Sequence, residues 1–174
     1  NKLREYKESI RSVVVESRSA TGSVIKQELG NALQGLLGEN ILNEKGVRSS
    51  GTILIGTPAS SSLIASLKIE NRLLTLGKEG FLILTTTISG KKCIVISANA
   101  DTGLLYGTFH FIRLIQTNQQ IRNLSIQSAP TIKIRILNHW DNLDRTVERG
   151  YAGFSLWDWH KLPEFIDTRY VDYA

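Results

Sequence analysis

The sequence predicts an α/β fold, with a sheet flanked by helices over residues 1–130 and a second part over residues 131–174 that opens with a further strand-like run. Two observations support this prediction. Short runs rich in β-branched residues alternate with segments whose apolar residues recur every three or four positions, as expected for alternating strands and helices. A last strand-like run, at 131–137, leads into a stretch that holds all three tryptophans.

The first half of the chain predicts two strands and two helices. Val13, Val14 and Val15 dominate a strand at 9–17. A helix should follow over about 22–37, because its apolar residues form one face, and Gly38 can end it. A second strand is predicted at 52–57 and a short helix at 60–67.

Next come two strands, 80–87 and 92–97, joined by a hairpin-like connection around Ser89, Gly90 and Lys91. Cys93 belongs to the second strand, where we expect a buried, inert thiol. As the single cysteine of the chain, it excludes an internal disulfide and a cysteine-based metal cluster.

A helix should then run from Asp101 to about Gln116, with the Asp101 side chain as its N-cap. Gly103 and Gly107 share one helical face, which predicts close packing on a sheet, and His110 is expected to be half-buried. The residues expected to face the core are Leu104, Leu105, Phe109, Ile112 and Ile115. A strand at 121–126 would precede a domain boundary at Ala129–Pro130.

Composition and spacing exclude several functions. The net charge of +5 is scattered and forms no basic stripe, which argues against nucleic-acid binding. No phosphate-binding glycine loop, nucleophile elbow or metal-ligand spacing occurs, so we expect no metal and no cofactor. No apolar run reaches the ~20 residues of a membrane span. The chain begins at Asn1 without any methionine, so we expect it to be a piece of a longer protein whose compartment stays open.

The segment after residue 137 carries the strongest chemical signal. Asn138, His139, Trp140 and Asp141 would emerge at the carboxyl end of the predicted strand, where (β/α) barrels bind substrates. Indole, amide, imidazole and carboxylate groups together suit a sugar. Two alternatives stay open: the tryptophans can be packing residues, and Asp141 and Asp144 can be either catalytic or structural.

The residues from Leu137 to Asp144, followed by Val147–Gly153 and Ser155–Trp157, resemble the start of the catalytic barrel in glycoside hydrolase family 67, the xylan α-glucuronidases. The stretch Asp101–Phe109 resembles the helix that this family places after the sheet of its N-terminal domain. That domain is similar to the second domain of the β-hexosaminidases, which implies a sandwich of a mixed sheet between helices. Arg145 and Phe154 depart from the family pattern and leave the substrate preference open.

The resemblance implies an inverting hydrolase that releases glucuronic acid or 4-O-methyl-glucuronic acid from xylooligosaccharides. Its acid and base are expected beyond residue 174, so no catalytic residue is assigned here and the chain alone should be inactive. Trp140 is expected to line the uronic-acid pocket, supported by Asp141, His139 and Asn138. The expected partner is glucuronoxylan or its oligosaccharides, the parent enzyme can be a homodimer, and neither nucleic acid nor membrane is expected.

Two other functions stay open at this point. One is a non-catalytic carbohydrate-binding or interaction module with the tryptophans as a surface platform. The other is a different hexosaminidase-like hydrolase, which would act on N-acetylhexosamine instead of a uronic acid.

Overall fold

The computed structural model describes residues 2–136 and 159–170, and the chain divides into two compact units, Asn1–Thr131 and Ile132–Ala174. Within residues 2–136 the first unit contains a six-stranded sheet in the order β2-β1-β3-β5-β4-β6. Its strands are β1 (Ser12–Val15), β2 (Leu42–Asn43), β3 (Thr52–Gly56), β4 (Phe81–Ile88), β5 (Lys91–Ala98) and β6 (Ser125–Ser128).

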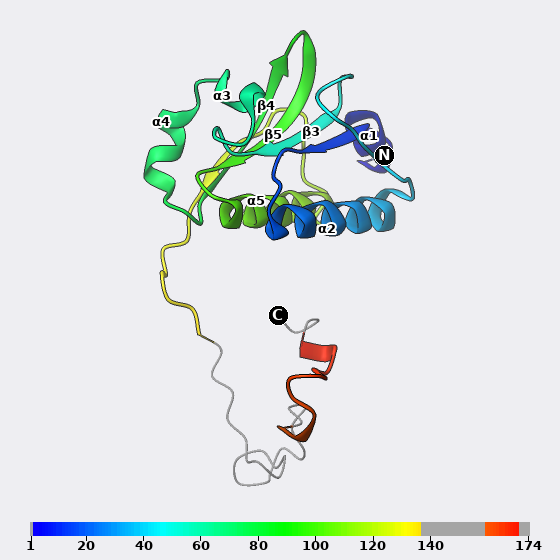
Figure 1. The fold of residues 1–174 in the computed structure, drawn as a ribbon. Coiled ribbons are helices and arrows are strands. Elements are labelled where there is room, and N and C mark those ends of the chain that lie inside the picture. The colour runs from blue at the N-terminus through cyan, green and yellow to red at the C-terminus, as the bar shows by residue number, and fades with distance from the viewer. Residues whose placement is uncertain (1, 137–158, 171–174) are drawn as a thin grey trace. The chain divides into compact units, whose positions relative to one another are not determined.

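The sheet is mixed, and helices cover both of its faces (Figure 1). β1 pairs in parallel with β2 and β3, and β3 pairs in parallel with β5, whereas β4 runs antiparallel to both β5 and β6. The predicted α/β fold with a mixed sheet is therefore confirmed. β3 is buried at every position, as expected for a central strand covered on both sides.

The hairpin between β4 and β5 is also confirmed. Ser89 and Gly90 have φ values of 48° and 77°, the left-handed conformation that tight two-residue hairpins require. Its strands extend one residue beyond the predicted range at most ends. Cys93 on β5 is buried, as predicted.

Two long helices, α2 (Ala20–Leu37) and α5 (Asp101–Gln116), lie side by side on one face of the sheet (Figure 1). α2 begins two residues before its predicted start because the Ser19 side chain caps it, accepting a hydrogen bond from the backbone N of Gly22 at 3.0 Å. It ends as predicted at Gly38, whose φ of 70° is left-handed.

Two predictions for α5 were wrong. Its N-cap is the extended residue Ala100, and Asp101 already lies in the helix, where its Oδ2 accepts a hydrogen bond from Ser17 Oγ at 3.0 Å. Phe109, expected in the core, is 47% exposed, and Phe111 is fully buried in its place. Leu104, Ile112 and Ile115 are buried and Leu105 packs against the core, as predicted.

Close packing of α5 on the sheet is confirmed at both glycines. A Cβ at Gly103 would lie 2.3 Å from the backbone oxygen of Gly80, and one at Gly107 would lie 2.8 Å from Ile96 Cγ2. Both distances are shorter than van der Waals contact. The helix therefore approaches β4 and β5 more closely than any larger residue would allow.

Short helices cover the opposite face: α3 (Ser62–Ala65), α4 (Glu70–Leu73) and the 3-10 turn η1 (Leu74–Leu76). They bury Ile64, Leu73 and Leu76 against Leu54 and Val95, which forms a second core cluster. α3 lies within the predicted helix at 60–67, whereas α4 and η1 were not predicted.

Two predictions at the strand ends need correction. The range 9–17 contains the end of an unpredicted helix, α1 (Lys2–Ser9), as well as β1. The last strand is β6, at 125–128 instead of 121–126, because Ile121 and Leu124 are buried in the core outside the ladder. Leu124 N instead donates to Thr85 Oγ1 at 2.9 Å.

In the second unit, the described residues 132–136 form no strand, in contrast to the predicted run at 131–137. Ile132, Ile134 and Ile136 are 66%, 76% and 82% exposed. A barrel strand needs a neighbour on each side to pair its backbone groups, and the described residues provide none here. The described residues of this unit include the 3-10 helix η3 (Trp159–Lys161).

Candidate functional site

The residues predicted to bind substrate, Asn138, His139, Trp140 and Asp141, lie outside the described residues, as does Asp144. Their assignment stays a prediction. Among the cavities in the described part of the first unit, two lie at opposite ends of the parallel strands, and their polar groups differ in whether they already have partners.

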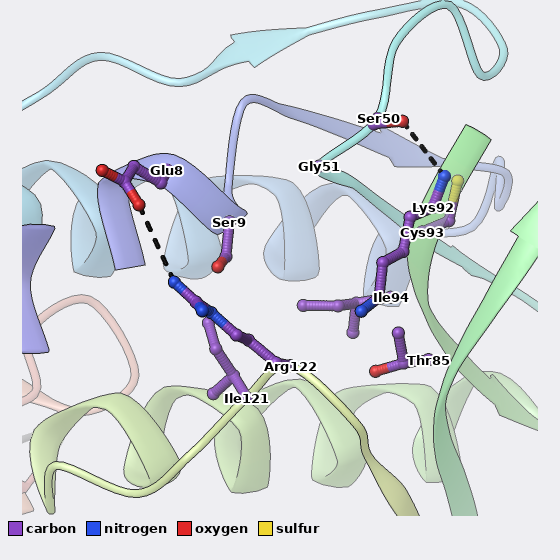
Figure 2. A pocket seen from close by; sticks show the side chains of 10 residues that line it. All are labelled: Glu8, Ser9, Ser50, Gly51, Thr85, Lys92, Cys93, Ile94, Ile121 and Arg122. Carbon is purple, nitrogen blue, oxygen red and sulfur yellow. Dashed lines mark hydrogen bonds and ion pairs between the residues drawn. The ribbon is translucent and has the colours of Figure 1, made fainter. Parts of the chain in front are cut away.

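The amino-edge cavity lies where the parallel strands begin and has a volume of about 350 Å³ (Figure 2). It is lined by Glu8, Ser9, Ser50, Gly51, Thr85, Lys92, Cys93, Ile94, Ile121 and Arg122. These residues come from α1, the loop before β3, the β4–β5 hairpin and the segment before β6. The cavity therefore gathers four parts of the chain that are far apart in sequence.

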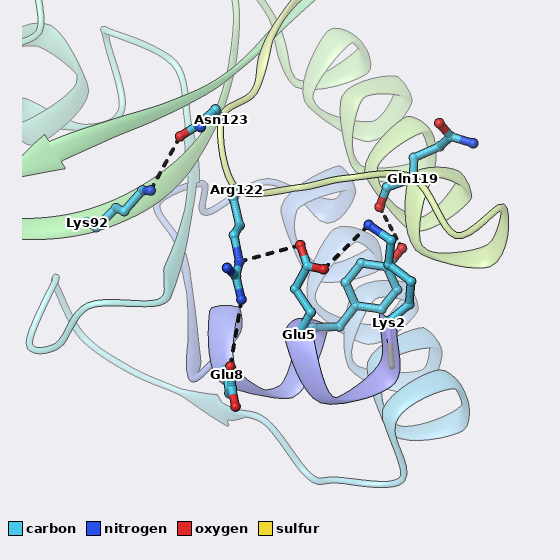
Figure 3. Close-up of polar contacts among 8 residues, drawn as sticks. Lys2, Glu5, Glu8, Lys92, Gln119, Arg122 and Asn123 are labelled. Carbon is cyan, nitrogen blue, oxygen red and sulfur yellow. Dashed lines mark hydrogen bonds and ion pairs between the residues drawn. The ribbon is translucent and has the colours of Figure 1, made fainter.

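Charged groups of the amino-edge cavity already have partners inside the protein (Figure 3). Arg122 lies 3.4 Å from Glu5 and 3.7 Å from Glu8, and Lys92 Nζ donates to Asn123 Oδ1 at 3.4 Å. Groups that are satisfied internally gain little from a ligand. We therefore interpret this cluster as the attachment of α1 and of residues 119–123 to the sheet.

Cys93 faces the same region but is poorly suited to react. Burial raises the pKa of its thiol, and Sγ donates a hydrogen bond to the backbone oxygen of Lys91 at 3.4 Å. Since the thiolate is the nucleophile, a raised pKa lowers reactivity near neutral pH.

We expect iodoacetamide at pH 8 to alkylate Cys93 far more slowly in the folded chain than in the chain unfolded by urea. Mass spectrometry at a series of times would measure both rates. The ratio of the unfolded-state rate to the folded-state rate should shrink as the pH rises above the pKa of an ordinary thiol, about 8.5, because only the folded-state thiol then still gains thiolate. Equal rates in the two states would contradict the buried position.

The carboxyl-edge cavity lies where β1, β2 and β3 end and has a volume of about 810 Å³. It is lined by Val14, Val15, Glu16, Ser17, Arg18, Lys26, Glu44, Lys45, Gly46 and Ser60. β1 continues into α2 on one face of the sheet, whereas its neighbour β3 continues into α3 on the other. The cavity thus lies at a topological switch point, the usual ligand position of open α/β sheets.

Hydrogen bonds made by hydroxyl groups fix the loops that line this cavity. Ser17 Oγ donates to Asp101 Oδ2 at 3.0 Å and lies 3.1 Å from Ser19 Oγ, so the ends of β1 and the starts of α2 and α5 are joined. On the next strand, Thr57 N donates to Ser60 Oγ at 2.9 Å, and Ser60 N donates to Thr57 Oγ1 at 3.0 Å.

The carboxylates of the cavity are not satisfied in this way. Among the described residues, Glu16 Oε2, Glu44 Oε2 and Ser97 Oγ are buried side-chain atoms without a hydrogen-bond partner, and the residues Glu16 and Glu44 both line this cavity. Their backbones are held firmly, because Glu16 N donates to Ile55 O at 2.8 Å and Glu44 N to Val13 O at 2.9 Å.

No group of three or more potential metal ligands occurs among the described residues. His110 is half-buried as predicted, with its ring 5.2 Å from that of Phe81, and burial lowers its pKa. Within the same residues, no helix is long and apolar enough to cross a bilayer.

The sequence did not reveal the carboxyl-edge cavity. Its signal was the run Glu16-Ser17-Arg18 directly after a valine-rich strand, at the place where α/β sheets bind ligands. Glu44 and Ser60 join that run only through the order of the strands, which the sequence does not state.

Two family models match the chain. Residues 1–111 match "Glycosyl hydrolase family 67 N-terminus" and residues 114–174 match "Glycosyl hydrolase family 67 middle domain". Together they account for nearly all of the sequence.

Individual proteins that resemble this chain share about a quarter of its residues. A probable alpha-glucuronidase A of Aspergillus fumigatus is 26% identical over 141 residues, which cover 80% of this chain and 16% of the relative. The alpha-glucuronidase A of Emericella nidulans is 25% identical over 180 residues, which cover 98% of this chain and 21% of the relative. The chain therefore spans about a fifth or less of these proteins.

Among solved structures, a family GH115 4-O-methyl-α-glucuronidase with specificity for decorated arabinogalactans superposes with a TM-score of 0.51 at 18% identity. The match covers 71% of this chain and 18% of that one. At this identity the likeness shows the fold alone.

Proposed function

The chain belongs to glycosyl hydrolase family 67, and we propose that it is the N-terminal portion of an inverting α-glucuronidase. The enzyme would release glucuronic acid or 4-O-methyl-glucuronic acid from xylooligosaccharides during xylan breakdown. The observation that carries this proposal is the pair of consecutive family matches, N-terminus followed by middle domain, together with relatives named alpha-glucuronidase.

Inversion requires a carboxylic acid that protonates the leaving oxygen and a carboxylate that activates water, about 6.5–9.5 Å apart. We assign neither role within residues 1–174. The 16–21% coverage of the relatives leaves most of the polypeptide to supply them.

Residues 132–174 would then open the catalytic barrel. The exposed Ile132, Ile134 and Ile136 support this, because a first barrel strand would bury such residues only once the following strands pair beside it. Trp140 would offer an aromatic face to the uronic acid, and Asn138, His139 and Asp141 would support it or bind its hydroxyls. Residues 1–130 would form the accessory domain, similar to the second domain of the β-hexosaminidases.

We expect the purified 174-residue chain to release no glucuronic acid from aldouronic acids, whereas a full-length family 67 enzyme releases it under the same conditions. Anion-exchange chromatography of the products would measure both, with the Emericella nidulans enzyme as the positive control. Release by the 174-residue chain would show that it contains its own acid and base. Absence of release by a full-length protein that contains this chain would contradict the proposed function.

A further inference from the structure

We propose that the carboxyl-edge cavity of the first unit binds a small sugar acid, a ligand that brings hydroxyl donors and one carboxylate to the same place. This proposal concerns a site in the α/β domain, and it stands or falls independently of the hydrolytic activity proposed above.

The buried carboxylate oxygens are the first argument. A buried acceptor without a donor is unfavourable and rare, and such atoms need an explanation in a folded protein. Of the three buried side-chain atoms without partners among the described residues, two are Glu16 Oε2 and Glu44 Oε2, and both residues line this one cavity. Once each side chain turns its carboxylate toward the cavity, hydroxyl groups of a ligand would supply the missing donors.

The cations of this cavity are the second argument. Arg18, Lys26 and Lys45 line the same cavity, and none has an ion pair with any described residue. The two glutamates share the cavity but form no ion pair with these cations. Arg18 in particular offers the planar donor fork that suits a carboxylate.

The combination of carboxylates and cations in one cavity limits the class of ligand that can bind. The lining holds three cations and two carboxylates, a formal charge of +1 that favours a ligand with a single negative charge. A sugar acid satisfies both sets, since its hydroxyls can donate to the glutamates while its single carboxylate accepts from Arg18 or a lysine. The lining contains no aromatic residue, so recognition would depend on polar groups.

The position and size of the cavity agree with a binding site. It lies at the switch point between β1 and β3, and its volume of about 810 Å³ falls within the usual range for small-molecule pockets, about 300–1,000 Å³. The amino-edge cavity of the same sheet provides a comparison within the protein, because its charged groups already have partners and should not bind the ligand.

Titration of the ¹⁵N-labelled 174-residue chain with sodium glucuronate, followed by amide chemical shifts, tests the proposal. Glucuronate should shift the resonances of residues 14–18 and 44–46, and should leave those of the amino-edge cavity unchanged. Glucose, which lacks the acid, and acetate, which lacks the hydroxyls, should each bind at least about tenfold more weakly, since each loses hydrogen bonds to charged groups.

Variants then separate a site from a general charge effect. Glu16→Gln and Arg18→Gln should each weaken glucuronate binding by about tenfold or more. The matched controls, Glu28→Gln on α2 and Arg11→Gln at the other end of β1, should not change it. Arg18 is exposed, so its variant should fold normally. Absence of glucuronate-dependent shifts at the carboxyl edge, equal binding of glucose or acetate, or equal losses in the controls would each overturn the proposal.

Discussion

Replacing Phe111 with alanine should lower the free energy of unfolding by about 3–5 kcal/mol, the usual cost of truncating a fully buried aromatic side chain. Phe111 is 0% exposed and lies in the core cluster between α5 and the sheet. Its removal leaves a cavity among rigidly packed neighbours. Because small domains are stable by only about 5–15 kcal/mol, the variant should lose a large part of its stability.

Urea unfolding of the 174-residue chain, followed by far-UV circular dichroism, would measure the change. Phe109→Ala is the matched control, since it removes the same side chain from the same helix at a site that is 47% exposed. That variant should lose about 1 kcal/mol or less. Equal losses at the two positions would mean that α5 presents a different face to the sheet.

These two phenylalanines show where sequence reasoning succeeded and where it stopped. The spacing of apolar residues correctly predicted α5 and most of its buried face, but it selected Phe109. Gly103 and Gly107 form a row four residues apart that contacts the sheet, and the next residue in that row is Phe111. At this position the glycine row therefore indicated the buried phenylalanine, whereas the apolar spacing selected the exposed one.

Elements held by distant partners were harder to predict. α1 has a mostly charged sequence, and its single buried residue, Tyr6, donates its hydroxyl to the Gln119 backbone oxygen, 113 residues away, at 2.6 Å. β6 is an edge strand whose residues are mostly exposed, so its sequence carries little strand signal, whereas the apolar Ile121 and Leu124 lie before it. Local periodicity cannot report either contact.

The two candidate sites also differ in how much of each the sequence could show. The predicted sugar-binding residues 138–141 lie outside the described residues, so their role rests on family membership. The carboxyl-edge cavity depends on three strands meeting in the order β2-β1-β3, with β1 and β3 continuing on opposite faces. A sequence shows which polar residues follow each strand, but only the topology shows which of them become neighbours.

Replacing Gly103 with alanine should destabilise the domain even though alanine is the better helix former. The new Cβ would lie 2.3 Å from the backbone oxygen of Gly80 and 2.7 Å from Ala98 Cβ, and a backbone atom cannot move aside as a flexible side chain can. Overpacking of this kind costs about 1–3 kcal/mol and occasionally more, which exceeds the gain of about 1 kcal/mol in helix propensity. α5 would have to lift from the sheet at its first turn.

Gly35→Ala on α2 provides the opposite control, because no atom beyond its chain neighbours and the backbone of its own helix lies within 4 Å of the added Cβ. That variant should gain up to about 1 kcal/mol, since it changes only helix propensity and the entropy of the unfolded chain. Thermal unfolding of both variants would therefore show shifts of opposite sign. A stabilised Gly103→Ala variant would contradict the close contact between α5 and β5, because the two substitutions differ only in the space that receives the methyl group.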